Sequence, residues 1–194
     1  MKHYTFLTNN NLNTFYFDFS NEKYSEYSKF WKVFPRLCVY FLPFLYRLVR
    51  SVQKEKEFDD FVKAFDNVLP KNNDEDRIHA IIDMCRRNTT YVTDKKLHGL
   101  PDYWATAIET LYRGVGDCDD YSILMCSILH KLGYDCIFIV MKDHLSVGVS
   151  GNFSGEYLMH HGKKYYYVDS TSRTDIGVIP KSHKDKFKIC FRGH

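Results

Sequence analysis

Gly116-Asp117-Cys118-Asp119-Asp120-Tyr121 is the stretch of sequence that decides the fold. The glycine permits a tight backbone approach, and Asp117 is a good N-cap for a helix that begins at Cys118. Asp120 stands where the second half of a capping box would be, although Glu or Gln is the usual residue there. The stretch therefore predicts a helix whose first turn carries a cysteine.

The sequence after this stretch predicts the rest of a helix and then a sheet. Apolar residues recur on one helix face as far as Leu132, and Gly133 stops the helix. Residues 136–141 then form a nearly continuous apolar strand, and 144–149 alternate with a period of two. Residues 155–160 and 164–169 predict a hairpin. We expect an α+β fold in which an antiparallel sheet packs on a central, buried helix.

Upstream of the cysteine, the pattern predicts further helices after a distinct leader. Apolar residues at three- and four-residue steps indicate helices over 58–68, 73–85 and 105–111, with a short extended piece at 90–92. Residues 1–53 are rich in aromatic residues and asparagine and hold no chemical motif. We interpret 1–53 as a mostly helical extension that packs on or near a catalytic domain over 54–194.

One apolar segment, residues 34–49, is the only candidate for contact with a membrane. Arg36, Pro43 and Arg47 interrupt it, and its longest uncharged stretch is far below the roughly 20 residues that a span needs. It could cover a core, bind a partner or lie on a membrane surface, and core or interface packing is the simplest interpretation. The polar start of the chain does not resemble a secretory signal, so we expect a cytoplasmic location.

Composition excludes several classes of function. The formal net charge of +3 is far from the concentrated basic stripe that nucleic-acid binding needs. The six cysteines include no C-x-x-C pair, so their spacing suggests neither a zinc site nor a disulfide framework. Cys126, eight residues into the central helix, is expected to be a small core residue.

Three residues predict a catalytic triad in the order Cys118, His144, Asp169. A cysteine in the first turn of a helix meets unpaired N–H groups and the positive end of the helix dipole, which favour the thiolate. His144 opens one strand and Asp169 ends another, so a sheet packed on the helix could bring all three together. His160 is an alternative base, whereas His130 lies too far along the helix.

A family resemblance supports this prediction. The chain is similar to the nucleophile segment of the transglutaminase-like superfamily, and then to its histidine and aspartate segments, at residues 103–106, 109–111, 114–122, 132–144 and 166–171. It most resembles the bacterial transglutaminase-like cysteine proteinases, over about residues 73–180. The resemblance implies a papain-like fold and thiol chemistry at amide bonds.

The resemblance leaves three functions open. The first is a hydrolase of peptide or isopeptide bonds that forms an acyl-enzyme at Cys118, with a protein or peptide as substrate. The second is a transglutaminase-type acyltransferase, in which an amine resolves the same thioester. The third is a catalytically silent module that binds a peptide or partner in the cleft. An intact triad argues against the third.

Other residues near the nucleophile carry weaker expectations. No cofactor is required, but some similar proteinases bind calcium at positions that Asp117 and Asp119 occupy here, and calcium favours such oxygen ligands. The alternative is that Asp117 caps the helix while Asp119 and Asp120 complement its dipole. Trp104 could line the cleft or assist the oxyanion through its indole N–H, or simply pack beside the central helix.

Overall fold

The structure is a computed structural model that describes residues 1–32, 43–172, 174–184 and 188–191. Its helices are α1 (Asn21–Lys32), α2 (Pro43–Gln53), α3 (Lys56–Val68), α4 (Asp74–Asn88), α5 (Asp94–His98), α6 (Ala107–Arg113), α7 (Cys118–Lys131) and the 3₁₀ turn η1 (Lys181–His183). Its strands are β1 (Lys2–Thr8), β2 (Asn11–Phe17), β3 (Thr90–Tyr91), β4 (Val115–Gly116), β5 (Cys136–Met141), β6 (His144–Val149), β7 (Tyr157–His160), β8 (Lys163–Val168) and β9 (Lys188–Phe191).

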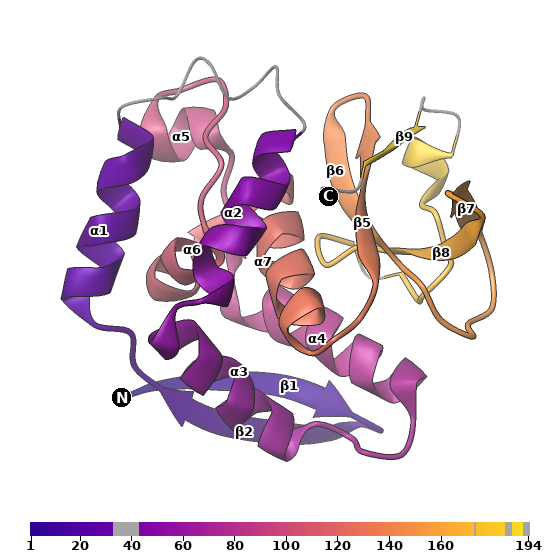
Figure 1. Cartoon of the computed structure of the whole chain (residues 1–194), viewed down its shortest axis with the longest axis horizontal. Helices are drawn as coiled ribbons and strands as arrows, with labels where there is room; N and C mark the ends of the chain where they lie inside the picture. The colour runs from indigo at the N-terminus through magenta and orange to yellow at the C-terminus, as the bar shows by residue number, and fades with distance from the viewer. Residues whose placement is uncertain (33–42, 173, 185–187, 192–194) are drawn as a thin grey trace.

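A five-stranded antiparallel sheet forms one side of the molecule, in the order β7-β8-β6-β5-β9. Helix α7 packs on β6 and β5 and lies between the sheet and α6 (Figure 1). The predicted α+β arrangement is therefore confirmed, including the helix that starts at Cys118, the strand that starts at His144 and the C-terminal hairpin.

The start of α7 is fixed by the predicted capping box. The Asp117 side chain accepts a hydrogen bond from the Asp119 N–H at 3.3 Å, and the Asp120 side chain accepts one from the Asp117 N–H at 3.2 Å. A Cβ at Gly116 would lie 2.6 Å from the Asp120 side chain, so only glycine fits there. The other oxygen of Asp120 accepts from the Ala105 N–H at 2.7 Å, which ties the preceding loop to the helix.

The first 17 residues form a β-hairpin that the sequence does not predict. Strands β1 and β2 pair from Lys2↔Phe17 to Thr8↔Asn11 and pack on α4 and α3. Asn9 and Asn10 turn the chain with φ of 48° and 65°, the left-handed pair that a tight hairpin turn requires. The hairpin buries Phe6 and Phe15 among the phenylalanines of α3. The extension is thus a hairpin followed by two helices.

Helix α2 joins the extension to the sheet. Its Leu45, Leu48 and Val49 side chains are buried, and Tyr46 Oη donates to the carbonyl of Cys136 in β5 at 2.9 Å. The apolar side chains at 44–46, 48 and 49 of the segment 34–49 therefore take part in the core, whereas Arg47 is exposed and 34–42 lie outside the described residues. Within the described ranges, every helix is too short or too polar to cross a bilayer.

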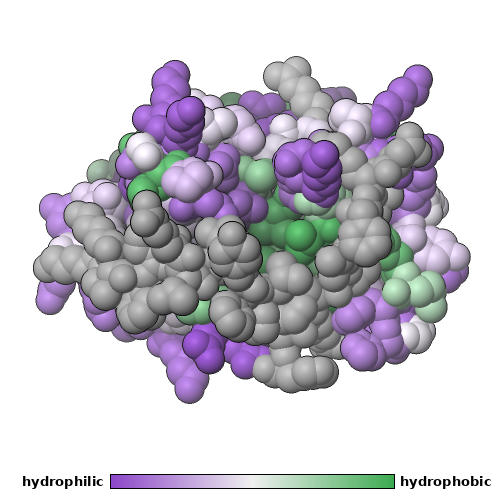
Figure 2. Space-filling model, turned by 90° about the horizontal axis from the view of Figure 1, so that it is seen from above, coloured by the Kyte–Doolittle hydropathy of each residue, from purple (hydrophilic) through white to green (hydrophobic). Residues whose placement is uncertain are grey.

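An apolar cavity of about 220 Å³ lies among α1, α2 and the start of α6. Its lining is Glu26, Tyr27, Phe44, Arg47, Leu48, Ser51 and Thr106. Among the described residues, the face of the molecule seen from above shows a patch of apolar side chains with hydrophilic side chains near it (Figure 2). None of the residues predicted to carry chemistry lines this cavity.

Candidate active site

The nucleophile helix and the histidine strand meet at one residue. Cys118 is the first residue of α7 and is partly exposed, and the backbone of Leu145 hydrogen-bonds to its thiol. One turn further along α7, Ser122 Oγ donates to the carbonyl of Leu145 at 2.9 Å. Because Leu145 follows His144 in β6, these two bonds hold the start of β6 against the start of α7.

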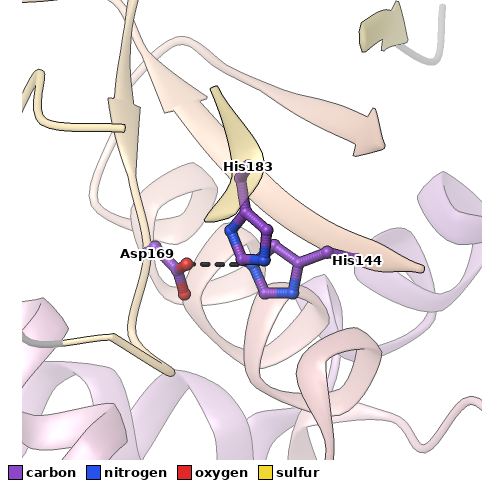
Figure 3. Close-up of side chains that lie close together, drawn as sticks. All are labelled: His144, Asp169 and His183. Atoms are coloured by element: carbon purple, nitrogen blue, oxygen red, sulfur yellow. Dashed lines mark hydrogen bonds and ion pairs between the residues drawn. The ribbon is translucent and has the colours of Figure 1, made fainter. Parts of the chain in front are cut away.

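His144 and Asp169 form a buried pair. His144 Nε2 lies 2.9 Å from Asp169 Oδ2, and their side chains are 7% and 2% exposed (Figure 3). Asp169 accepts three more hydrogen bonds, from Tyr167 Oη at 2.9 Å, the Thr171 N–H at 2.8 Å and Thr171 Oγ1 at 2.7 Å. The carboxylate is therefore held in one orientation toward the imidazole.

The hydrogen bonds to Asp169 determine which histidine nitrogen can act as a base. Burial alone would raise the pKa of Asp169, but the hydrogen bonds from His144 and Thr171 outweigh it and lower that pKa to about 2. An ionised carboxylate only accepts hydrogen bonds, so the proton of the shared bond belongs to His144 Nε2. In the neutral ring, Nδ1 is then the nitrogen that can take a proton from a thiol.

The surroundings of the Cys118 thiol oppose its ionisation. Burial raises the pKa of the thiol above its ordinary value, and the charge of Asp119 raises it further, while the Leu145 hydrogen bond lowers it. The start of α7 favours the thiolate, which is the effect that the sequence suggests. Burial and neighbouring charge act against that effect and favour the protonated thiol.

A cluster of carboxyl groups lies beside Cys118. Oxygens of Asp94, Asp117 and Asp120 are all within 4.8 Å of one another. Asp94 is 2% exposed, and its Oδ1 has no hydrogen-bond partner among the described residues. Near this cluster, the carboxyl groups of Asp102 and Asp119 hydrogen-bond to each other. So many acids at one place require protons or a cation.

The pKa values of these acids reflect that crowding. Burial, followed by the charge of Asp117, raises the pKa of Asp94 to about 7. Burial likewise raises the pKa of Asp119 well above its ordinary value, and the charges of Asp102 and Asp117 add to this effect. The pKa of Asp120 is raised mainly by burial. A bound cation would favour the ionised form of every one of these groups.

The indole N–H of Trp104 donates a hydrogen bond to one of these carboxyl groups. Its Nε1 donates to Asp119 Oδ2 at 3.1 Å, and the side chain is 8% exposed. The N–H that the sequence suggests for an oxyanion thus already serves a carboxylate next to Cys118. Packing beside α7, the other sequence interpretation, agrees with this burial.

Several residues join the site without a signal in the sequence. The ring of His183, from η1, lies on the ring of His144 with centroids 4.3 Å apart (Figure 3). Tyr167 and Asp94 also contact predicted site residues only because the chain returns to them. The alternative base, His160, ends β7, which β8 separates from β6. The structure thus brings Asp169 to His144 and not to His160.

The structure thus holds a thiol at a capped helix start and a hydrogen-bonded histidine and aspartate pair on the adjoining sheet. The family model described as the transglutaminase-like superfamily matches residues 63–168, more than half of the chain. The chain therefore belongs to the transglutaminase-like superfamily, which includes cysteine hydrolases and acyltransferases. No curated protein matches the chain in a direct search. Cys118 and His144 lie inside the matched region, and Asp169 follows it directly.

Proposed function

We propose that the protein is a cysteine hydrolase that cleaves peptide or isopeptide bonds through an acyl-enzyme at Cys118. The observation that carries the proposal is the hydrogen bond between His144 Nε2 and Asp169, made beside the capped N-terminus that bears Cys118. That bond orients a neutral imidazole and supports the imidazolium that forms during the reaction. The reaction requires that the imidazole contact the thiol on one side and the carboxylate on the other.

In the proposed reaction, His144 Nδ1 takes the proton of the Cys118 thiol as the sulfur attacks the carbonyl carbon of an amide. The new C–S bond pushes the carbonyl electrons onto oxygen, and the N–H of Cys118, which the helix cap does not use, stabilises that charge. His144 then gives its proton to the departing amine as the C–N bond breaks, which leaves a thioester.

Water completes the proposed cycle. His144 takes a proton from water, whose oxygen attacks the thioester carbonyl, and the proton returns to the sulfur as the acid product leaves. Asp169 keeps its negative charge throughout, in agreement with its four hydrogen bonds and its lowered pKa. The histidine thus carries the proton in each half-reaction.

We also propose that the carboxyl cluster holds a calcium ion. Calcium takes several oxygen ligands, and Asp94, Asp117 and Asp120 offer three within 4.8 Å of one another. The unpartnered, buried Oδ1 of Asp94 is an oxygen that needs such a partner. When bound, calcium would supply positive charge that offsets the carboxylates around the thiol. The Asp119 oxygen lies in a second group that includes the Cys118 sulfur, a poorer ligand for this ion.

An acyl-donor experiment tests the proposed function without knowledge of the substrate. The full-length protein is treated with p-nitrophenyl acetate, and acetylation of each cysteine is followed by peptide mass spectrometry. We expect the acetyl group on Cys118, slower acetylation in His144→Ala and Asp169→Asn, and none at this position in Cys118→Ala. Each variant is checked for folding by circular dichroism, and His161→Ala, at the exposed turn between β7 and β8, is the matched control.

The fate of the thioester separates the two enzymatic functions. Loss of the acetyl group in buffer alone supports the hydrolase. If loss requires an added primary amine such as methylamine, and the product is the acetylated amine, the acyltransferase replaces it. A Cys118 that is acetylated no faster than Cys85, and equally fast in His144→Ala, would show that the site is silent.

A further inference from the structure

A second imidazole covers the predicted base. The ring of His183 lies on the ring of His144, with centroids 4.3 Å apart and planes inclined by only 18° (Figure 3). The two rings come from different parts of the chain, η1 and the first residue of β6. His183 also lies beyond residues 63–168, the region that the family model matches.

The chain between Asp169 and η1 is shaped to return to the site. Gly155 and Gly177 cross so closely that a Cβ on Gly177 would lie 2.2 Å from the carbonyl oxygen of Ser154. Both glycines have positive φ, and the Glu156 N–H donates to the Gly177 carbonyl at 2.6 Å. Side chains of any size are therefore excluded from both positions, and the return path of the chain is fixed.

The same acidic residue then anchors the approach to η1. Glu156 accepts a hydrogen bond from the Ile179 N–H at 3.1 Å and pairs with Lys184 at 3.2 Å. Ile179 itself is buried against the sheet. His183 lies between these two contacts, so its position over His144 follows from several bonds and not from one side-chain rotamer.

The geometry of the rings decides between two roles for His183. An oxygen or nitrogen of each of His144, Asp169 and His183 lies within 4.8 Å of the others, a spacing that could suit a metal ion. A metal ligand bond of about 2 Å lies in the plane of an imidazole ring. Two nearly parallel planes separated by a stacking distance share no such point. The stacked arrangement therefore favours an action of one ring on the other.

We propose that His183 is a positioning residue that keeps the His144 ring in its catalytic orientation by stacking on it. Rotation about the Cβ–Cγ bond of His144 would turn its ring edge-on into His183, so the stack blocks that motion. Nε2 stays on Asp169, which leaves Nδ1 as the nitrogen that can act as the base. The stack also covers one face of the His144–Asp169 hydrogen bond, whose two side chains are already 7% and 2% exposed. This role rests on the proposed function.

Substitutions at His183 test the stack itself. His183→Phe keeps a flat ring but no nitrogen, His183→Ala removes the ring, and Lys181→Ala changes an exposed residue of the same short turn. The readouts are the rate at which iodoacetamide alkylates Cys118, and the NMR signals of the His144 ring in protein labelled with ¹⁵N-histidine. Unfolding midpoints are measured alongside, to separate positioning from folding.

We expect His183→Ala to slow alkylation of Cys118 by about threefold to tenfold, the factor that loss of a stacked aromatic pair gives. The His144 ring protons should lose their ring-current shift, and the ring should show both neutral tautomers. His183→Phe should restore the rate and the single Nε2–H tautomer, and Lys181→Ala should match the wild type.

The outcomes distinguish this inference from the proposed function. If Cys118 of the wild type is unreactive, the proposed function fails, while the tautomer and ring-current signals still report on the stack. If Cys118 is reactive but His183→Ala leaves its rate and the His144 signals unchanged, the positioning role is wrong. Failure of His183→Phe to restore the rate, with added zinc changing the wild-type His144 signals stoichiometrically, would show a metal ligand instead.

Discussion

Trp104 donates its indole N–H to the carboxyl group of Asp119, with 3.1 Å between Nε1 and Oδ2. Asp119 follows Cys118, so this bond holds in place the carboxyl group whose charge raises the pKa of the Cys118 thiol. The indole thus acts on the residue beside the sulfur. This contact leads to the first of five predictions, because it can be removed by a substitution that keeps an aromatic ring.

Trp104→Phe should destabilise the protein by about 1–3 kcal/mol, because a buried carboxyl group loses its donor. Urea unfolding at neutral pH measures the change, and Tyr16→Phe, at a residue 61% exposed, is the control. Combining Trp104→Phe with Asp119→Ala should cost less than the sum of the single changes, since each change removes the same hydrogen bond. Additive costs would mean that the indole N–H and the carboxyl group do not interact in solution.

The carboxyl cluster predicts that the free energy of unfolding depends on pH, and Asp94→Asn should reduce this dependence. The pKa of Asp94 is about 7 in the folded protein, against an ordinary value of 3.8, so the folded state binds the proton more tightly. The stability that this group contributes is present at acidic pH and is lost as pH rises from about 4 to about 7. Asp94→Asn has no titrating carboxyl group at this position, so this loss of stability with rising pH is absent in the variant.

Unfolding in urea at pH 5 and pH 8, with a chelator present, measures this difference. We expect the variant to gain about 1–2 kcal/mol relative to the wild type between the two pH values, after allowance for solvent screening. Asp175→Asn, an exposed residue outside the cluster, is the control. A wild type and Asp94→Asn with parallel pH profiles would contradict the raised pKa.

Much of the fold follows from local signals in the sequence. The capping box at Asp117 and the period-two pattern from His144 predict α7 and β6, because each depends on residues close together in the chain. The hairpin of β1 and β2 was missed, although Asn9-Asn10 is a turn signal, because aromatic residues there mask the alternation of a strand. Helix α5 has only five residues, too few for a periodic pattern.

The candidate site likewise contains some residues that the sequence predicts and others that it does not. The order of Cys118, His144 and Asp169 along the chain, with the elements on which they lie, predicts that they meet. Asp94 and His183 carry no such signal, since their places depend on how loops return after α4 and after β8. The effect of burial on the Cys118 thiol was also beyond local pattern, because burial depends on the whole tertiary structure.

Calcium should stabilise the protein if the carboxyl cluster is a cation site. Mass action predicts a gain of about 2.7 kcal/mol when free calcium is a hundred times its dissociation constant. Calorimetry with calcium, magnesium or a chelator measures the rise in unfolding temperature, and magnesium should raise it less, because it demands stricter geometry. Asp94→Asn and Asp117→Asn should remove the rise, and Asn at position 117 preserves the helix cap. If calcium raised the unfolding temperature of both variants as much as that of the wild type, its binding site would lie elsewhere.

Thr171→Val should weaken the support of Asp169. The substitution removes the hydroxyl that donates to Oδ1 at 2.7 Å but keeps the backbone N–H that donates at 2.8 Å. A hydrogen bond to a charged group is worth about 1.5–3 kcal/mol, so a loss of this size is expected at pH 7. Thr171→Ser retains the hydroxyl and should resemble the wild type.

The sign of the pH dependence distinguishes this loss from simple repacking. The pKa of Asp169 is about 2 in the folded protein and is ordinarily 3.8, so its contribution to stability is present above about pH 4 and disappears as pH falls toward 2. The gap between wild type and Thr171→Val should therefore narrow between pH 5 and pH 3 in urea unfolding. A gap that stays constant would point to packing alone.

The extension over residues 1–53 should be necessary for a stable fold. Leu45, Leu48 and Val49 are at most 1% exposed, and burial of each such side chain contributes about 1.5–3 kcal/mol. A chain that lacks 1–53 would also expose the apolar face of α3 that the hairpin covers. We expect it to lose cooperative unfolding, as measured by circular dichroism in urea. A truncated chain that unfolds cooperatively at the wild-type midpoint would instead show that residues 54–194 fold alone.

A milder test of the same contact is Tyr46→Phe, which removes the hydrogen bond to Cys136 and should reduce the free energy of unfolding by about 1 kcal/mol.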